Sequence, residues 1–183
     1  HETVFKQLVC DRLGMHPNDV HYVQGDTDAV FFGEGTGGSR TATVGGSALY
    51  LAAEKIVDKA TKIAQKMLGD DDVDFKDGIF TGRKTNQSLT ISEVAKGSTH
   101  PKNLPDGMEV GLIANAVYAN DLMNYPSGSH VCELEIDEET GVVEILRYNV
   151  VDDVGTVLNP LLLKGQIHGG ISQGVGQMLM EDL

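Results

Sequence analysis

Residues 33–46, GEGTGGSRTATVGG, combine bare backbone with hydroxyl side chains. The stretch holds six glycines, one arginine and four hydroxyl residues: Thr36, Ser39, Thr41 and Thr43. Because glycine has no side chain, such a loop can present several amide N–H groups to one anion. We interpret it either as a loop that holds a phosphate-bearing cofactor or as a flexible loop without a ligand.

Part of this loop also fits a dinucleotide-binding pattern. Gly33, Gly35 and Gly38 match G-x-G-x-x-G, in which glycines let a diphosphate approach the start of a helix. In that fold the helix begins inside the motif, whereas helical periodicity here begins only at Ser47. The context therefore argues against a Rossmann site.

A second glycine cluster, GQIHGGISQGVG, occupies residues 165–176. Each glycine inside a helix costs about 1 kcal/mol relative to alanine, so five of them need a reason. Close packing of another helix is one reason. The other is a cofactor or a second backbone against this face, where the Gln166 amide could both donate and accept hydrogen bonds.

No other residue pattern indicates catalysis or metal binding. His168 has no second histidine or carboxylate at ligand spacing, and we expect it to be structural, like His16, His21, His100 and His130. His1 stands at the chain end and cannot be interpreted. No GxSxG or HExxH sequence is present.

Composition excludes several classes of partner. The 183 residues carry a formal net charge of -13, which disfavours nucleic acid and anionic membrane surfaces. No apolar run reaches the roughly 18 residues of a membrane span. Cys10 and Cys132 stand apart in apolar patterns, so we expect buried, reduced thiols in a cytoplasmic protein.

These motifs need elements to position them. Apolar periodicity predicts helices over residues 2–13, 47–68 and from Asn159–Pro160 onward, with a helical turn at 92–96. Alternation predicts strands at 20–24, within 73–91, at 108–120, and in a hairpin of 130–137 with 142–155. We find no repeat or linker, and predict one α+β domain over residues 1–183, with helices packed on a mixed or antiparallel sheet.

Taken in order, the motifs resemble a known family. HETVFKQLVCDRLG with VQGDTD, then GTGGSR before a long helix, then DDVGTVLNPLLLKGQIHGGISQGVGQ are similar to the molybdenum-binding large subunit of the xanthine dehydrogenase, aldehyde oxidase and aerobic carbon monoxide dehydrogenase family. The most specific part is D-x-G-x-x-x-N-P followed by G-Q-x-x-G-G-x-x-Q-G, here Asp153 to Gly174.

The resemblance implies an oxidoreductase that hydroxylates its substrate with oxygen from water. It implies a molybdenum–molybdopterin cofactor, in some members the cytosine dinucleotide form, with iron–sulfur and FAD centres on partner domains or subunits. The family's cofactor loop corresponds to Gly37, Gly38, Ser39 and Arg40, and its pterin-contacting glutamine corresponds to Gln166.

The resemblance also implies that parts of the site lie outside this sequence. The family's G-Q-G motif would stand immediately before His1, and its catalytic glutamate is expected beyond Leu183; neither Glu181 nor Asp182 matches it. We therefore expect a fragment of a molybdopterin-binding catalytic domain that is inactive alone. Its partners would be the rest of the subunit, the iron–sulfur and flavin components, and a small-molecule substrate.

Two other functions stay open at this point. The chain could be a non-catalytic packing or assembly module whose glycines serve only close contact, or it could be a nucleotide-binding domain. The sequence names neither the substrate, nor the dinucleotide form of the cofactor, nor the oligomeric state.

Overall fold

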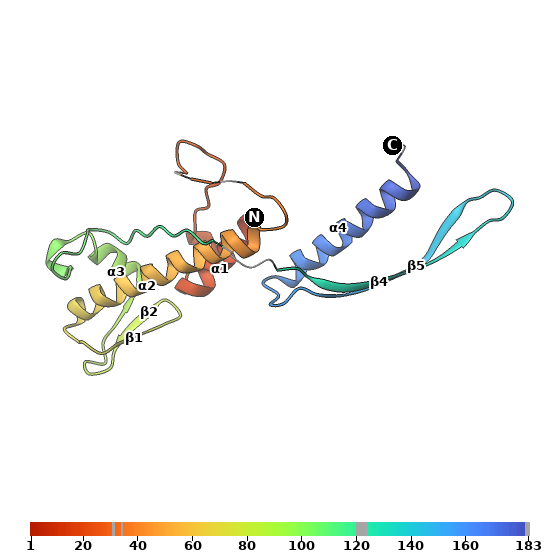
Figure 1. Cartoon of the computed structure of the whole chain (residues 1–183). Coiled ribbons are helices and arrows are strands. Elements are labelled where there is room, and N and C mark those ends of the chain that lie inside the picture. Colours follow the sequence, from red (N-terminus) through yellow and green to blue (C-terminus); the bar gives the residue numbers. More distant parts are fainter. Residues whose placement is uncertain (31, 34, 120–123, 182–183) are drawn as a thin grey trace. The chain divides into compact units, whose positions relative to one another are not determined.

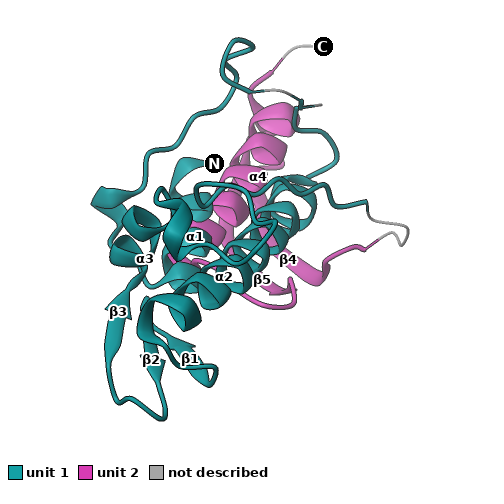
Figure 2. Ribbon diagram, turned by 90° about the vertical axis from the view of Figure 1, so that its left-hand side faces the viewer, with its two compact units in different colours: residues 1–120 teal, residues 121–183 magenta. Residues whose placement is uncertain are grey.

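The computed structural model describes residues 1–30, 32–33, 35–119 and 124–181, and the chain divides into two compact units. Unit 1 is His1–Asn120 and unit 2 is Asp121–Leu183 (Figure 2). Each contains helix and antiparallel sheet, which confirms the α+β class. That residues 1–183 form one domain of a larger protein stays a prediction.

The helices of unit 1 follow the predicted periodicity (Figure 1). Helix α1 spans Glu2–Leu13 and ends at Gly14, whose φ of 64° is left-handed. Helix α2 spans Gly46–Leu68 and is preceded by a π-helical turn, Thr41–Gly45. Helix α3 spans Ile91–Gly97 and begins with a capping box between Thr90 and Glu93. Two 3-10 turns, Pro17–Asp19 and Pro101–Asn103, complete the helical elements of the described part of unit 1.

A three-stranded antiparallel sheet completes the regular structure of unit 1. Its strands are β1 (Val73–Lys76), β2 (Ile79–Gly82) and β3 (Ser88–Thr90), in the order β1-β2-β3. Phe75 and Phe80 are register partners in β1 and β2, and their ring centroids are 4.5 Å apart. The strands predicted within residues 73–91 are therefore confirmed.

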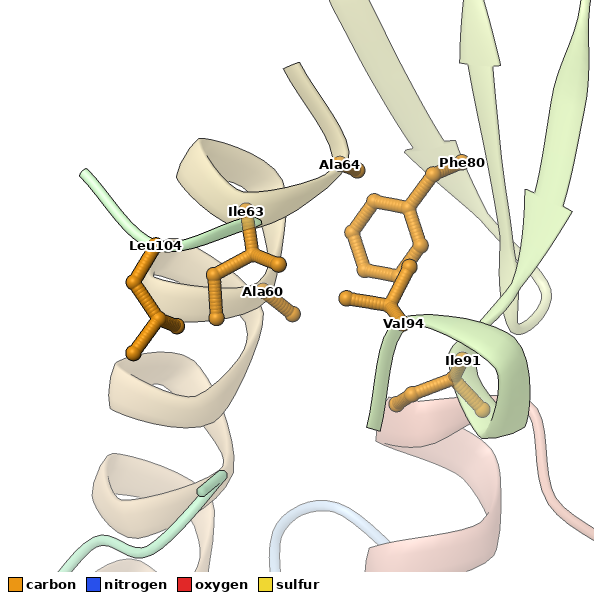
Figure 3. Close-up of a cluster of buried hydrophobic side chains, with 7 residues drawn as sticks. All are labelled: Ala60, Ile63, Ala64, Phe80, Ile91, Val94 and Leu104. Atoms are coloured by element: carbon orange, nitrogen blue, oxygen red, sulfur yellow. The ribbon is translucent and has the colours of Figure 1, made fainter. Parts of the chain in front are cut away.

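The core of unit 1 forms where α2 meets the sheet and α3. Phe80, Val94 and Ile63 are each 0% exposed, and Figure 3 shows Phe80 and Val94 facing Ala60 and Ala64 of α2. Small alanines on the helix leave room for the aromatic ring, and the spacing 60, 63, 64 places all three α2 residues on one face. The full cluster is Ala60, Ile63, Ala64, Phe80, Ile91, Val94 and Leu104.

A buried carboxylate ties the loop after α2 to the sheet. The Asp70 carboxylate, with the residue 3% exposed, accepts hydrogen bonds from the amides of Asp72, Lys84 and Thr85 at 2.9–3.0 Å and from the Thr85 hydroxyl at 3.1 Å. Burial is the largest single effect and acts to raise the pKa of Asp70, but the hydrogen bonds together outweigh it and lower that pKa.

Two predicted strands of unit 1 are wrong. Residues 20–24 and 108–119 form no strand among the described residues; Asn120, where the second predicted strand ends, lies outside that range. Alternating apolar and polar residues indicate only that one side of a segment is covered. A strand also needs a neighbouring strand whose backbone hydrogen-bonds to it. One bond joins the second segment to α2, since Lys55 Nζ donates to the Asn115 carbonyl at 2.8 Å. Just before the segment, Lys66 Nζ of the same helix donates to the Leu104 carbonyl at 2.6 Å.

Unit 2 consists of one long hairpin and one helix. Strands β4 (Ser127–Ile136) and β5 (Val143–Asp153) pair antiparallel, with an irregularity at Glu133/Leu134, and helix α4 spans Pro160–Leu179 behind an Asn159 cap. The predicted hairpin and helix are confirmed. None of the described residues of this unit is buried.

The prediction that both cysteines are buried is half wrong. Cys10 is buried, but Cys132 is exposed, because it lies on the two-stranded sheet and neither strand has a buried residue. Both thiols are free.

Phe80→Ala should lower the free energy of unfolding of unit 1 by about 3–5 kcal/mol, because it leaves a cavity where no water reaches the ring. Ile79→Ala, on the adjacent residue of β2 with 44% exposure, is the matched control and should cost about 1 kcal/mol or less. Urea unfolding followed by circular dichroism measures both. Equal losses would contradict the assigned core.

Asp70→Asn should weaken unit 1 at neutral pH and reduce its sensitivity to acid. A carboxylate whose folded pKa is lowered contributes stability above its unfolded pKa of about 3.9, and this contribution disappears as pH falls through the lower folded pKa. The measurement is the urea midpoint from neutral pH down to about pH 2, with the exposed Asp106→Asn as control. A wild-type pH profile in Asp70→Asn would show that the carboxylate has no such role.

Candidate functional site

The glycine loop of unit 1 is an exposed loop closed on itself. The Arg40 amide donates to the Gly37 carbonyl at 3.3 Å, and the Arg40 guanidinium donates to the Gly35 carbonyl at 3.2 Å. Gly35, Gly38 and Ser39 have φ values of 73°, 57° and 55°. The four predicted residues Gly37 to Arg40 thus form one tight turn, and Arg40 helps to hold its shape.

This turn leads directly into a helix start without a side-chain cap. Helical structure begins at Thr41, earlier than the predicted Ser47, and no side-chain cap hydrogen bond is formed by Arg40, the residue before it. The first amides of a helix have no acceptor inside the helix, and the helix dipole makes this end electropositive. The core at Ala60 to Ala64 fixes the direction of α2, so a rigid element carries these amides.

A polar network behind the loop was not predicted. The hydroxyls of Thr36 and Thr41 are 2.6 Å apart, and each lies 3.5 Å from His1 Nε2. On the other side of the ring, His1 Nδ1 lies 3.0 Å from the Gln24 amide nitrogen. Tyr22 donates to Gln24 Oε1. Burial, and then the Glu2 charge, raise the pKa of Tyr22.

Few sequence signals indicate this network. Thr36 and Thr41 belong to the hydroxyl residues of the glycine-rich stretch, but a histidine at the chain end, such as His1, carries no pattern that predicts its contacts. Tyr22 and Gln24 lie in the segment that was predicted as a strand. The network ties the start of α1, the segment after the first 3-10 turn and the glycine loop into one polar surface.

Gln166, the other predicted residue, lies on α4 in unit 2. It is exposed, and Gly169 and Gly170 follow at the i+3 and i+4 positions of the same helical face. The helix starts at Asn159, whose side-chain Oδ1 accepts from the Leu162 amide at 3.1 Å. That Gln166 and residues 37–40 line a common concavity concerns both units and stays a prediction.

The glycines themselves test whether these elements fit a large ligand. Of 22 glycines, most have a positive φ or a neighbour within 4 Å of an added Cβ. Six have neither, so the described fold gives no reason for the missing side chain. These are Gly33, Gly37, Gly165, Gly169, Gly170 and Gly174.

All six belong to the two clusters that the sequence distinguished. Open space at these positions is what a bulky group with many acceptor oxygens needs, and the exposed amides and the Gln166 side chain supply donors for it. The residues therefore fit a cofactor of the molybdopterin kind. Close packing within the described part of either unit does not explain them.

Other features of the described residues do not add to this site. Two open surface hollows in unit 1 have volumes of about 490 and 410 Å³, and neither is lined by a predicted site residue. The described part of the chain contains no group of three or more His, Cys, Asp or Glu that could hold a metal ion. Within the same residues, no helix is long and apolar enough to cross a membrane.

Comparison with known proteins agrees with this chemistry. The profile of the molybdopterin cofactor-binding domain family matches residues 1–183. Among curated relatives, the chain is 37% identical over 183 residues to the 6-hydroxypseudooxynicotine dehydrogenase complex subunit gamma of Paenarthrobacter nicotinovorans, covering 99% of this chain and 23% of the relative. It is 36% identical to the carbon monoxide dehydrogenase large chain of Hydrogenophaga pseudoflava, covering 95% and 22%.

Solved structures give the same result. The Cu,Mo-CO dehydrogenase in its carbon monoxide reduced state aligns with a TM-score of 0.83 and 36% identity, over 93% of this chain and 22% of that one. Quinoline 2-oxidoreductase from Pseudomonas putida 86 aligns with a TM-score of 0.85 and 30% identity, over 97% and 23%. The chain thus spans less than a quarter of the length of these relatives.

Proposed function

Because the chain belongs to the molybdopterin cofactor-binding domain family, we propose that it supplies part of the cofactor site of a molybdenum hydroxylase. The activity would belong to a larger polypeptide, because these relatives are about four times as long as this chain. The reaction would be oxidation of a small molecule with water as the oxygen source, as the resemblance to the family implies.

One observation carries this proposal. The six glycines whose missing side chains the described fold does not explain all lie in the loop or in α4. A module that used glycine only for close packing would place neighbours against those Cα atoms. We propose instead that the cofactor occupies the open space beside these glycines.

Each predicted residue then has a role in binding. The amides of Gly37 and Gly38 and the amide and hydroxyl of Ser39 would donate to the cofactor's oxygens, while the Arg40 guanidinium holds the turn. The Gln166 amide would both donate to and accept from the pterin. When bound, the cofactor supplies the oxygen-transfer and two-electron redox chemistry, which no side chain of this chain provides.

The charge of the chain makes local donors important. At a formal net charge of -13, the long-range field repels an anionic cofactor. Backbone amides attract the cofactor's oxygens at short range, although they are neutral, so the site needs no cationic side chain for each oxygen. The iron–sulfur and flavin components that would accept the electrons are part of this proposal, as is the cytosine dinucleotide form of the cofactor.

Gly37→Val should make the complete protein that contains this chain retain about tenfold less molybdenum and pterin, because the new side chain occupies the cofactor's space. Gly37 has an ordinary φ and nothing within 4 Å of an added Cβ, so the melting midpoint of the cofactor-free protein should stay unchanged. Gln166→Leu, which keeps side-chain size but removes the amide, should lower retention in the same direction. Metal analysis after gel filtration and thermal unfolding measure these effects.

Ser88→Val is the matched control, at an exposed position of β3 in unit 1, and should retain cofactor like the wild type. Equal cofactor content in Gly37→Val and wild type would contradict the proposal. A melting midpoint that rises with free nucleotide, in a protein that holds no molybdenum, would favour a nucleotide-binding domain instead.

A further inference from the structure

A hydrogen-bonded group of three side chains lies on the hairpin of unit 2, outside the proposed cofactor residues. His130 Nδ1 lies 3.0 Å from the Tyr148 hydroxyl, and His130 Nε2 lies 3.3 Å from Asp152 Oδ1. The His130 and Tyr148 rings meet edge to face, with centroids 5.8 Å apart. We refer to His130, Tyr148 and Asp152 as the His130 cluster.

The register of the hairpin explains why these residues meet. His130 pairs with Val150, so Tyr148 and Asp152 are its two diagonal neighbours on the same face. Asp152 pairs with Gly128, where an added Cβ would lie 2.0 Å from Asp152 Oδ1. The carboxylate therefore reaches His130 through the space that a side chain at position 128 would fill.

A consistent set of proton positions follows from the partners. The Asp152 carboxylate accepts only, so His130 Nε2 carries a proton and donates to it. In the neutral ring Nδ1 then accepts from the Tyr148 hydroxyl. If the ring is protonated, the Tyr148 oxygen accepts instead, so both hydrogen bonds persist in either state.

Among the described residues, the end of the hairpin that holds this cluster has no third strand beside it. β4 starts with Ser127, Gly128 and Ser129, residue types that form strands poorly. The sheet has only two strands, and this end lies farthest from the turn at residues 137–142. Side-chain bonds across the strands add to the backbone ladder at this end and limit its fraying.

The same end continues into the second proposed cofactor element. After Asp152, the Asp153 carboxylate accepts from the Gly155 amide at 2.9 Å, and Asn159 then caps α4, which carries Gln166. The position of the end of β5 therefore determines where the short connection from Asp153 to Asn159 begins.

We propose that His130 is a positioning residue: with Tyr148 and Asp152 it fixes the end of β5 and thereby the segment leading to Gln166. This inference rests on the proposed cofactor function for its consequence, but not for its geometry. The sequence analysis predicts only a general structural role for His130. This inference gives it a specific one.

The test uses hydrogen–deuterium exchange of the complete protein, read at the amides of residues 150–159, together with molybdenum content. His130→Phe keeps an aromatic ring beside Tyr148 but removes both hydrogen bonds, and should speed exchange about tenfold. Gly128→Ala displaces the Asp152 carboxylate without changing His130 and should act in the same direction, although alanine is the better strand former. His130→Gln, which can restore one bond, should give an intermediate rate.

Ser129→Ala, whose partner is Val151 on the opposite face, is the matched control and should exchange like the wild type. Both His130→Phe and Gly128→Ala should also retain less molybdenum than this control. Wild-type exchange in these two variants would overturn the proposal, and so would faster exchange with unchanged molybdenum. If the wild type holds no molybdenum, the proposed function fails, and the exchange rates alone decide whether the His130 cluster holds the end of β5.

Discussion

The direction of one helix governs the first part of this molecule. Helix α2 is fixed by the contact of Ala60, Ile63 and Ala64 with Phe80 and Val94, and its other end opens into the glycine loop. A loop alone would present its amides in many directions, at an entropic cost to any ligand. Because the loop leads into a packed helix and closes on itself through Arg40, we propose that its amides are oriented before a ligand binds.

The second unit has local hydrogen bonds, where the first unit has a hydrophobic core. No described residue of unit 2 is buried. Its regular structure has the β4–β5 ladder and the hydrogen bonds of Asp153 and Asn159, and we propose that the His130 cluster holds one end of the hairpin. Large apolar side chains of unit 2 are exposed, including Leu134, Ile136 and Leu161. The two units thus differ in what holds them, although each carries one of the proposed binding elements.

The sequence predicted most helices, the short strands and the hairpin, because their periodicity and caps are local. It failed at residues 20–24 and 108–119 because pairing depends on a neighbour that alternation cannot reveal. It placed Cys132 in a core because apolar sequence does not say whether anything covers a sheet. The cofactor-binding role of Gly37–Arg40 and Gln166, which the family resemblance implies, stays a prediction. The network around His1 and the His130 cluster could not be predicted, because they depend on contacts between residues distant in sequence.

We propose that missing side chains in two glycine clusters leave room for one anionic cofactor. An experimental structure of the complete protein with its cofactor bound tests this proposal. Cofactor oxygens should lie within about 3 Å of the amides of residues 37–40, and the Gln166 amide should contact the pterin. Protein side chains filling the space beside Gly37, Gly165 and Gly169, with the cofactor elsewhere, would contradict it.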